Sequence, residues 1–278
     1  LCLPMIGFGQ FTDNFSDGDF TSNPIWVGDV GSFEVDTNNI LHLNDSIASS
    51  SSLVTQSQAI VNGEWIFNVR LDFSPSTNNY ARVYLVSDMI DLSGPLNGMY
   101  VKIGGQTGSV DDISLYTQSG TNHNEIIDGI AGLVTNDPDI RVKATRDAVG
   151  NWELFLDTAG VFFTQGTAFD NSITSSDYFG VFCKYTVTRS KKFWFDDFNV
   201  SGSFLVDTIR PVVIAAQINS ASSVLVTFSE TIDSITAVNP TNYVLDNGIG
   251  TPTNITINNP KTIELFFGAP FVNLTIYQ

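Results

Sequence analysis

Five aspartates of this 278-residue sequence fall into two groups, and clustered carboxylates could bind a cation or take part in catalysis. They are Asp13, Asp17 and Asp19 in FTDNFSDGDF, and Asp196 and Asp197 in FWFDDFNV. Oxygen atoms are the ligands that Ca²⁺ prefers, about 6–8 of them for each ion. The first group is not an EF-hand loop, because Phe15 stands at the third position, where that loop requires Asp or Asn.

The two groups of aspartates are expected to meet in space. In jelly-roll folds the first and last strands commonly pair, which would place residues 11–15 beside residues 193–198. Asp13 would then approach Asp196 or Asp197, and like charges at short range repel unless a cation or hydrogen-bond donors compensate. Either the five aspartates hold a structural Ca²⁺, or one carboxylate of the Asp196–Asp197 pair accepts backbone N–H bonds from the N-terminal turn without a metal. The second alternative is the simpler one.

The carboxylates do not form a recognisable catalytic pair. A glycoside hydrolase needs two of them facing each other across a cleft, about 5–5.5 Å or 6.5–9.5 Å apart. Asp196 and Asp197 are neighbours in a predicted strand, so we expect them to point to opposite faces. Glu64, Glu125 and Glu153 lie far apart in the sequence. We therefore expect no hydrolase activity.

Nucleophilic catalysis and a zinc site are equally unsupported. The two histidines are His42, on a predicted strand surface, and His123, in a polar turn, and no G-x-S-x-G motif accompanies them. Cys2 falls in the apolar N-terminal stretch, whereas Cys183 alternates with apolar residues and is expected to be buried. We predict that the chain is not an enzyme and has no disulfide framework.

The elements that must position these residues are β-strands. Apolar and polar residues alternate in many segments rich in Val, Ile, Tyr, Phe and Thr, with Gly, Asn, Asp and Ser between them. The stretch RDAVGNWELF is typical of a hairpin, and no segment has the periodicity of an amphipathic helix. Many short strands separated by turns predict an all-β antiparallel sandwich or jelly roll. The alternating segments are 64–73, 80–88, 98–105, 112–118, 140–147, 152–158, 178–187 and 193–200.

The charge balance excludes several kinds of partner. The sequence has 12 Lys and Arg residues against 29 Asp and Glu residues, a formal net charge of −17. Such a chain repels nucleic-acid phosphates and anionic membrane surfaces. Only 15% of the residues are charged, and Ser, Thr, Asn and Gly are abundant instead, as is common in extracellular β-proteins. We therefore expect no nucleic-acid partner and no membrane insertion.

Aromatic residues offer a candidate binding surface. Carbohydrate sites combine exposed rings, which stack on sugar rings, with a few polar side chains that contact the hydroxyl groups. Trp26 follows a proline loop and is predicted to lie at the rim of such a site. Tyr80, Tyr100 and Tyr116 lie on or beside central strands and would form a platform if they shared one face. The alternative is that the tyrosines only pack within the sheet.

The order of the segments predicts two domains. Residues 1–10 are uncharged and mostly apolar, and we interpret them as the remnant of a signal peptide. A jelly roll is expected over 11–203, followed by a hinge at 204–211. A new β-pattern over 212–278 has the spacing of an Ig-like sandwich but is too short for its roughly seven strands. We expect this domain to be truncated at its C-terminus and to belong to a longer multidomain chain.

Two resemblances agree with this division. Residues 207–278, with DTIRPVV, SSVLVTFSETID, NPTNYVLD and FVNLTIYQ, resemble bacterial SbsA-type Ig-like domains. Residues 11–203, with DNFSDGDFTSNPIWVGDVGSFEVD, LHLN and FWFDDFNVSG, resemble the concanavalin-like or laminin-G-like jelly-roll modules of large secreted surface proteins of Bacteroidetes. The resemblance implies a fold and an extracellular location at the cell surface, and it implies no single ligand.

The resulting hypothesis is a secreted, non-enzymatic module for adhesion or carbohydrate binding, held away from the cell by an Ig-like spacer. Its partner would be a glycan or another extracellular surface polymer, bound through Trp26, Tyr80, Tyr100 and Tyr116. The alternative is an accessory region of a larger secreted enzyme whose catalytic domain lies beyond residue 278. A structural Ca²⁺ is the one cofactor that the sequence suggests.

Overall fold

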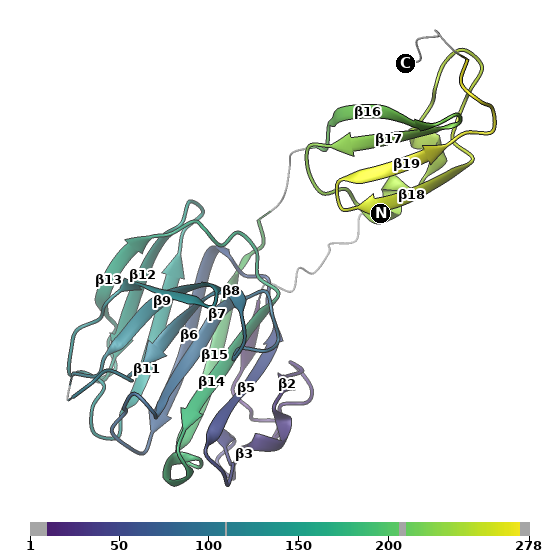
Figure 1. Ribbon diagram of the computed structural model, residues 1–278. Coiled ribbons are helices and arrows are strands. Elements are labelled where there is room, and N and C mark those ends of the chain that lie inside the picture. Colours follow the sequence, from purple (N-terminus) through teal and green to yellow (C-terminus); the bar gives the residue numbers. More distant parts are fainter. Residues whose placement is uncertain (1–9, 109, 206–209, 273–278) are drawn as a thin grey trace. The chain divides into compact units, whose positions relative to one another are not determined.

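The computed structural model describes residues 10–108, 110–205 and 210–272. The chain divides into two compact units, residues 1–206 and 207–278 (Figure 1). The boundary falls inside the range in which a hinge is expected. The predicted signal-peptide remnant lies outside the described residues, apart from Gln10.

The first unit is built from two antiparallel sheets, here called sheet A and sheet B. The strands of sheet A are β1 (Phe11–Asp13), β3 (Phe33–Val35), β4 (Leu41–Leu43), β6 (Val61–Leu71), β11 (Asp139–Arg146), β12 (Asn151–Asp157), β13 (Phe163–Phe169) and β15 (Phe193–Ser203). The strands of sheet B are β2 (Val27–Gly28), β5 (Ser49–Gln56), β7 (Tyr80–Ser87), β8 (Leu96–Ile103), β9 (Ile113–Gly120), β10 (Asn122–Ile127) and β14 (Tyr178–Tyr185).

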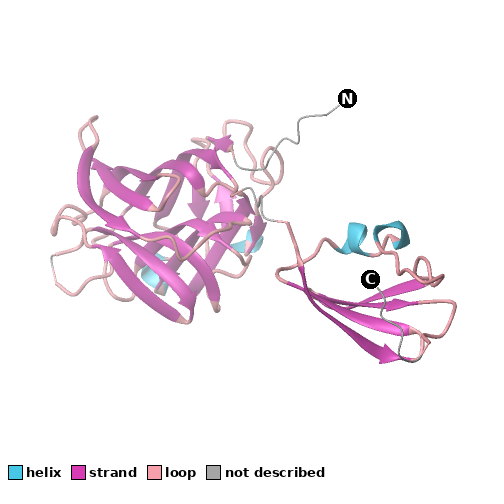
Figure 2. Cartoon of the chain, turned by 90° about the horizontal axis from the view of Figure 1, so that it is seen from above, coloured by secondary structure: helices cyan, strands magenta, loops and turns pink. Residues whose placement is uncertain are grey.

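The two sheets form a sandwich, so the predicted fold class is confirmed for this unit (Figure 2). Sheet A has the strand order β13-β12-β11-β6-β15-β4-β3, with β1 paired to β15. Sheet B has the order β10-β9-β8-β7-β14-β5-β2. Two short 3-10 helices, η1 (Val30–Ser32) and η2 (Val187–Arg189), lie in the connections.

Alternation of residue types along the strands produces one apolar core between the sheets. In β6 the side chains of Trp65, Phe67, Val69 and Leu71 are buried, and the residues between them lie half-buried on the outer face. Every second side chain reaches the core because successive side chains of a strand point to opposite faces. Cys183 in β14 is fully buried in this core, as the sequence predicts.

The first and last strands of this unit pair as predicted. Strand β1 lies antiparallel to β15, with Phe11 opposite Val200 and Asp13 opposite Phe198. The pairing brings Asp13 close enough to Asp196 for the two charges to interact. The N-terminal turn is therefore held beside the final strand of the sandwich.

The predicted hairpin of β11 and β12 is also present. Oδ1 of Asp147 accepts the backbone N–H groups of Val149 at 2.9 Å, Gly150 at 2.8 Å and Asn151 at 2.9 Å. Oδ2 of Asp147 accepts the side-chain amide of Asn151 at 2.6 Å. These hydrogen bonds favour the charged carboxylate and lower the pKa of Asp147 to about 2. The turn thus depends on one ionised side chain.

The prediction that the side chains of Asp196 and Asp197 in β15 point to opposite faces of the sheet is wrong. The backbone φ of Asp197 is +50°, and the register of β15 against β6 shifts between Asp196 and Asn199. Such a β-bulge inserts an extra residue and reverses the alternation beyond it. Phe198 therefore enters the core, whereas Asp196 is half-buried and Asp197 is exposed, both of them outside the core.

The second unit contains a four-stranded antiparallel sheet with the order β16-β17-β19-β18. Its elements are β16 (Val213–Ser220), β17 (Ser223–Phe228), α1 (Ser234–Ala237), η3 (Pro240–Asn242), β18 (Asn254–Asn259) and β19 (Thr262–Phe266). A small core forms around Val226, Phe228, Ile263, Leu265 and Phe267. The assignment of this unit as a truncated Ig-like domain stays a prediction. In neither unit does a described helix have the length and apolar character needed to cross a membrane.

Candidate functional site

The predicted tyrosines lie together on the outer face of sheet B. Strands β7, β8 and β9 are in register, so that Tyr84, Tyr100 and Tyr116 are directly opposite one another. The rings of Tyr100 and Tyr116 are parallel with centroids 5.2 Å apart, and those of Tyr84 and Tyr100 are 4.9 Å apart. Tyr80 begins β7 on the same face. The residues Tyr80, Arg82, Tyr84, Tyr100, Lys102, Tyr116, Phe182 and Lys184 are called the tyrosine surface below.

Neighbouring segments cover part of the tyrosine surface. Leu92, in the connection from β7 to β8, and Leu96, the first residue of β8, belong to the same apolar cluster as Tyr84, which is fully buried. Tyr100 is 1% exposed, and its hydroxyl hydrogen-bonds with Nδ1 of His123 at 3.0 Å. His123 lies in strand β10 and not in the predicted turn. Tyr84 and Tyr100 therefore form the buried floor of the surface. The prediction that the ring of Tyr100 is accessible to a ligand is wrong.

Tyr116 and Tyr80 differ from these two floor residues. Tyr116 is half-buried, so that part of its ring remains accessible on the outer face. Burial, followed by a hydrogen bond to Glu125 of β10, raises the pKa of Tyr116 above its usual value. Tyr80 is 8% exposed. A ligand on this surface would contact Tyr116 and the polar groups around Tyr80.

Three cationic side chains surround the ring of Tyr80. Its centroid lies 5.4 Å from the guanidinium carbon of Arg82, 5.2 Å from Nζ of Lys102 and 5.9 Å from Nζ of Lys184. Arg82 and Lys102 are directly opposite each other on β7 and β8, and Lys184 is opposite Tyr80 on β14. Aromatic faces attract cations at such distances. Three of the 12 Lys and Arg residues of a strongly acidic chain thus meet on one surface.

The Arg82 guanidinium is half-buried among aromatic rings, with its carbon 4.8 Å from the Tyr100 ring centroid and 5.2 Å from that of Phe182. Its Nη atoms donate to the hydroxyl groups of Tyr84 at 3.4 Å and Tyr80 at 3.3 Å, which are long hydrogen bonds. Its Nε is buried without a hydrogen-bond partner. Within the described ranges no carboxylate forms an ion pair with Arg82, Lys102 or Lys184. Burial and repulsion by Arg82 lower the pKa of Lys102.

Acidic groups approach the tyrosine surface on the side of Lys102. They are Glu125, Asp111 and Asp112, whose charges act on Lys102 without forming an ion pair with it. Oδ1 of Asp111 accepts the backbone N–H of Gly105 at 2.8 Å, and Oδ1 of Asp112 accepts the hydroxyl of Ser114 at 2.7 Å. Asp111 and Asp112 are therefore used in local contacts, and Glu125 hydrogen-bonds with Tyr116.

Trp26 is not a rim residue. It is 1% exposed, and its ring packs against Phe11, Phe179 and Phe198 with centroid distances of 6.1, 6.1 and 5.2 Å. Its indole Nε1 donates to Oδ2 of Asp13 at 2.8 Å. The proline loop before Trp26 turns its large ring into the sandwich, where burial of an aromatic side chain contributes most. Trp26 is therefore a core residue.

The five aspartates are not gathered around one point. Asp13, Asp17 and Asp197 line one cavity of about 450 Å³, whereas Asp196 lines a different one and Asp19 neither of the two. Each carboxylate already accepts a hydrogen bond. Their donors are the backbone N–H groups of Phe15, Asp19, Thr21 and Asp197 for Asp13, Asp17, Asp19 and Asp196, and Nδ2 of Asn68 for Asp197.

This donor set does not fit a calcium ion. Within the described ranges, no three Asp, Glu, His or Cys side chains lie close enough together to hold a metal. The metal-free alternative is wrong in its residues. Within the described residues Asp196 accepts the N–H of Asp197 and Asp197 accepts Nδ2 of Asn68, and neither accepts a backbone N–H of the N-terminal turn. The carboxylate that accepts such a bond is Asp13, from Phe15 at 2.9 Å.

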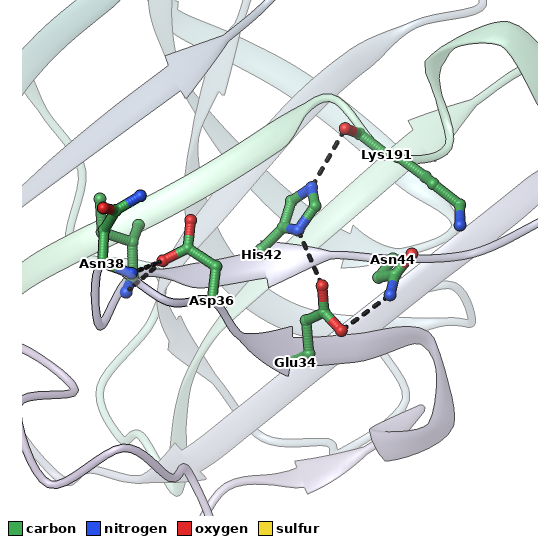
Figure 3. A network of polar contacts seen from close by, with 7 residues as sticks. Glu34, Asp36, Asn38, His42, Asn44 and Lys191 are labelled. Carbon is green, nitrogen blue, oxygen red and sulfur yellow. Dashed lines mark hydrogen bonds and ion pairs between the residues drawn. The ribbon is translucent and has the colours of Figure 1, made fainter.

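His42 joins two elements at the outer face of sheet A (Figure 3). Its Nδ1 lies 3.3 Å from Oε1 of Glu34, and its Nε2 lies 3.0 Å from the backbone oxygen of Lys191. The imidazole ring stacks on Trp194 with centroids 4.5 Å apart, and the Arg70 guanidinium carbon lies 4.1 Å from the Trp194 ring centroid. Both ring nitrogens have partners, so His42 is a structural residue of the strand surface.

The outer face of sheet A also carries two glutamates that are distant in sequence. Thr145 lies directly opposite Glu64 of β6 and Glu153 of β12, and all three line a cavity of about 760 Å³ together with the 62% exposed Phe169. Strand β11 separates the two glutamates, so their backbones lie about 10 Å apart. The two glutamates are far apart in the sequence, so their proximity could not be predicted without the order of strands in sheet A.

Comparison with known proteins relates the chain to lectin-like domains by fold. No family model and no curated protein sequence matches it. The Ca²⁺- and Man3GlcNAc-bound exoplasmic/lumenal domain of VIP36 is 12% identical, with a TM-score of 0.52 over 71% of this chain and 90% of that chain. A legume lectin-like domain from Entamoeba histolytica is 10% identical, with a TM-score of 0.53 over 72% and 99%.

A third structure extends the comparison. The potassium-bound carbohydrate recognition domain of Emp46p is 10% identical, with a TM-score of 0.54 over 70% of this chain and 97% of that chain. Metal-free forms of the VIP36 and Emp46p domains match with TM-scores of 0.51 each. At these identities the likeness shows a lectin-like sandwich fold. That fold occurs in those proteins with and without a bound metal.

Proposed function

We propose that the first unit binds carbohydrate through the tyrosine surface. The observation that carries the proposal is the half-exposed ring of Tyr116 beside a group of hydrogen-bond donors on one outer face of a lectin-like sandwich. Nζ of Lys102 lies 5.9 Å from the Tyr116 ring centroid, and Arg82 lies directly opposite Lys102 on the next strand. Tyr116 would contact a sugar ring, and the cations would donate hydrogen bonds to its oxygen atoms.

The wider setting that we propose is extracellular. The composition, poor in charged residues and rich in Ser, Thr, Asn and Gly, supports a secreted adhesion or glycan-binding module, with the second unit as an Ig-like spacer. In the alternative setting, the same unit is an accessory region of a larger secreted enzyme and delivers it to a glycan. In both settings the unit binds and does not cleave, and the binding requires no calcium at the five aspartates.

Binding of the full chain to a glycan array tests the proposal, followed by titration of the strongest ligand. Tyr116→Ala is expected to weaken binding about tenfold or more, as is usual for a central aromatic contact. Phe169→Ala is the matched control, because Phe169 is an exposed aromatic residue on the opposite sheet. Failure of the chain to bind any glycan would overturn the proposal. An equal loss in both variants would place the site elsewhere.

A further inference from the structure

The tyrosine surface concentrates positive charge, and this points to a particular class of ligand. We propose that it binds an acidic polysaccharide, with a carboxylate or sulfate group of the sugar held between Arg82, Lys102 and Lys184. The inference rests on the proposed carbohydrate binding and adds the charge of the ligand to it. Arg and Lys side chains donate hydrogen bonds and accept none, so this surface suits a ligand group that only accepts.

The positions of these cations destabilise the folded chain when no ligand is bound. Arg82 and Lys102 occupy directly opposite positions on β7 and β8, and like charges at such positions destabilise a sheet. Both side chains are also half-buried, which removes part of their hydration. Because the described part of the chain supplies no ion-pair partner for them, an anionic ligand would provide the missing counter-charge.

The geometry of Arg82 favours an anion over a neutral hydroxyl group. The guanidinium presents five N–H donors in a planar fork that matches the two oxygens of a carboxylate or sulfate. The Nη atoms of Arg82 make only long hydrogen bonds, to Tyr80 and Tyr84, and they are the donors that an anion would engage, because Nε is buried. Lys184 is exposed beside this group and can follow a ligand without rearrangement of the core.

The negative charge of nearby residues and of the whole chain favours some anionic polymers over others. The charges of Glu125, Asp111 and Asp112 act on Lys102, so an anion held by the three cations is favoured on the side of Arg82 and Lys184. The formal net charge of −17 repels densely charged polymers such as nucleic acids at longer range. A polysaccharide with one acidic group per sugar places fewer charges near the chain, and its neutral ring edges can contact Tyr116.

The test compares polymers that differ only in charge. Binding of the full chain is measured by isothermal titration with polygalacturonate and with its fully methyl-esterified form, in buffer containing EDTA. Dextran sulfate and dextran form a second pair, which separates a sulfate from a carboxylate preference. The acidic member of at least one pair is expected to bind about tenfold more tightly, and added salt should weaken that binding.

Substitutions of the three cationic residues test where the anion binds. Lys184→Gln and Lys102→Gln are each expected to weaken binding of the acidic polymer about fivefold. Arg82→Gln should weaken it more, and its melting temperature reveals whether the variant still folds. The matched control is Lys143→Gln, because Nζ of Lys143 lies 4.2 Å from the Phe155 ring centroid on the other sheet. This control should bind like the original chain.

The outcomes separate this inference from the proposed function. Equal binding of charged and uncharged polymers overturns the acidic ligand and leaves carbohydrate binding intact. Binding of neutral glycans alone has the same meaning. Absence of binding to every polymer and every arrayed glycan overturns both. Acid-selective binding that survives Lys184→Gln and Lys102→Gln unchanged also overturns the inference, because the anion would then lie elsewhere.

Discussion

Oδ2 of Asp13 accepts a hydrogen bond from the indole Nε1 of Trp26 at 2.8 Å, and both residues are buried. Oδ1 of the same carboxylate accepts the backbone N–H of Phe15 at 2.9 Å. Burial raises the pKa of Asp13, although these two hydrogen bonds and the charges of nearby aspartates also act on it. The carboxylate thus ties the N-terminal turn to the aromatic cluster that closes one end of the core.

Substitution of Asp13 tests this tie. In Asp13→Asn one carboxylate oxygen becomes an NH₂ group, which would face either the Trp26 indole N–H or the Phe15 N–H, donor against donor. We expect the free energy of unfolding to fall by about 1–3 kcal/mol, measured by urea denaturation. Asp17→Asn, at an exposed position, should change it by less than about 0.5 kcal/mol. Equal stability of Asp13→Asn and the original chain would contradict the assigned role.

Removal of divalent cations should leave stability unchanged. The five aspartates accept hydrogen bonds from turn and side-chain donors, and their oxygens do not converge on one point. Thermal unfolding of the full chain with EDTA and with excess Ca²⁺ is expected to give the same melting temperature. A clear increase with Ca²⁺ that Asp13→Asn abolishes would restore the metal site that the sequence suggests.

Asp196 should impose a pH-dependent penalty on folding. Burial, together with the charges of Asp197 and Asp13, raises the pKa of Asp196 to about 6. The folded chain therefore binds a proton that the unfolded chain has released, and this contribution to stability falls as the pH rises from about 4 to about 6. Asp196→Asn is expected to raise the melting temperature at about pH 8 and to have little effect at about pH 4. The reverse pattern would show that the charged form is favoured.

Asp147 should behave in the opposite way. Its pKa is lowered to about 2 by hydrogen bonds from the turn of the β11–β12 hairpin. Stability from the charged form is then complete above the unfolded pKa near 4 and is lost as the pH falls toward about 2. Asp147→Ala should lower the melting temperature at neutral pH, and the difference from the original chain should shrink in acid. A constant difference at all pH values would assign the effect to chain conformation and not to the charge.

The alternating residues predicted the sandwich because burial of one strand face leaves a period of two in the sequence. The same pattern located Cys183 in the core, whereas the turn residues predicted the hairpin around Asp147 and the jelly-roll fold predicted the pairing of the first and last strands. It failed at Asp197, because a bulge changes facing without changing residue types. Trp26 was also misplaced, since a loop gives no periodic signal of which way its large ring turns.

The amino-acid sequence by itself determined that this chain forms antiparallel strands and carries a strong negative charge, from which we expect no nucleic-acid or anionic-membrane partner. It also supplied the tyrosines Tyr80, Tyr100 and Tyr116 as a possible group. Only the tertiary structure decided which of them stay accessible and which cations join them. The physical reason is that Tyr80, Arg82, Lys102 and Lys184 meet through the register of three strands. The alternating pattern shows which face of a strand a residue occupies, but which residues of different strands lie opposite one another depends on the order and pairing of the strands in the sheet.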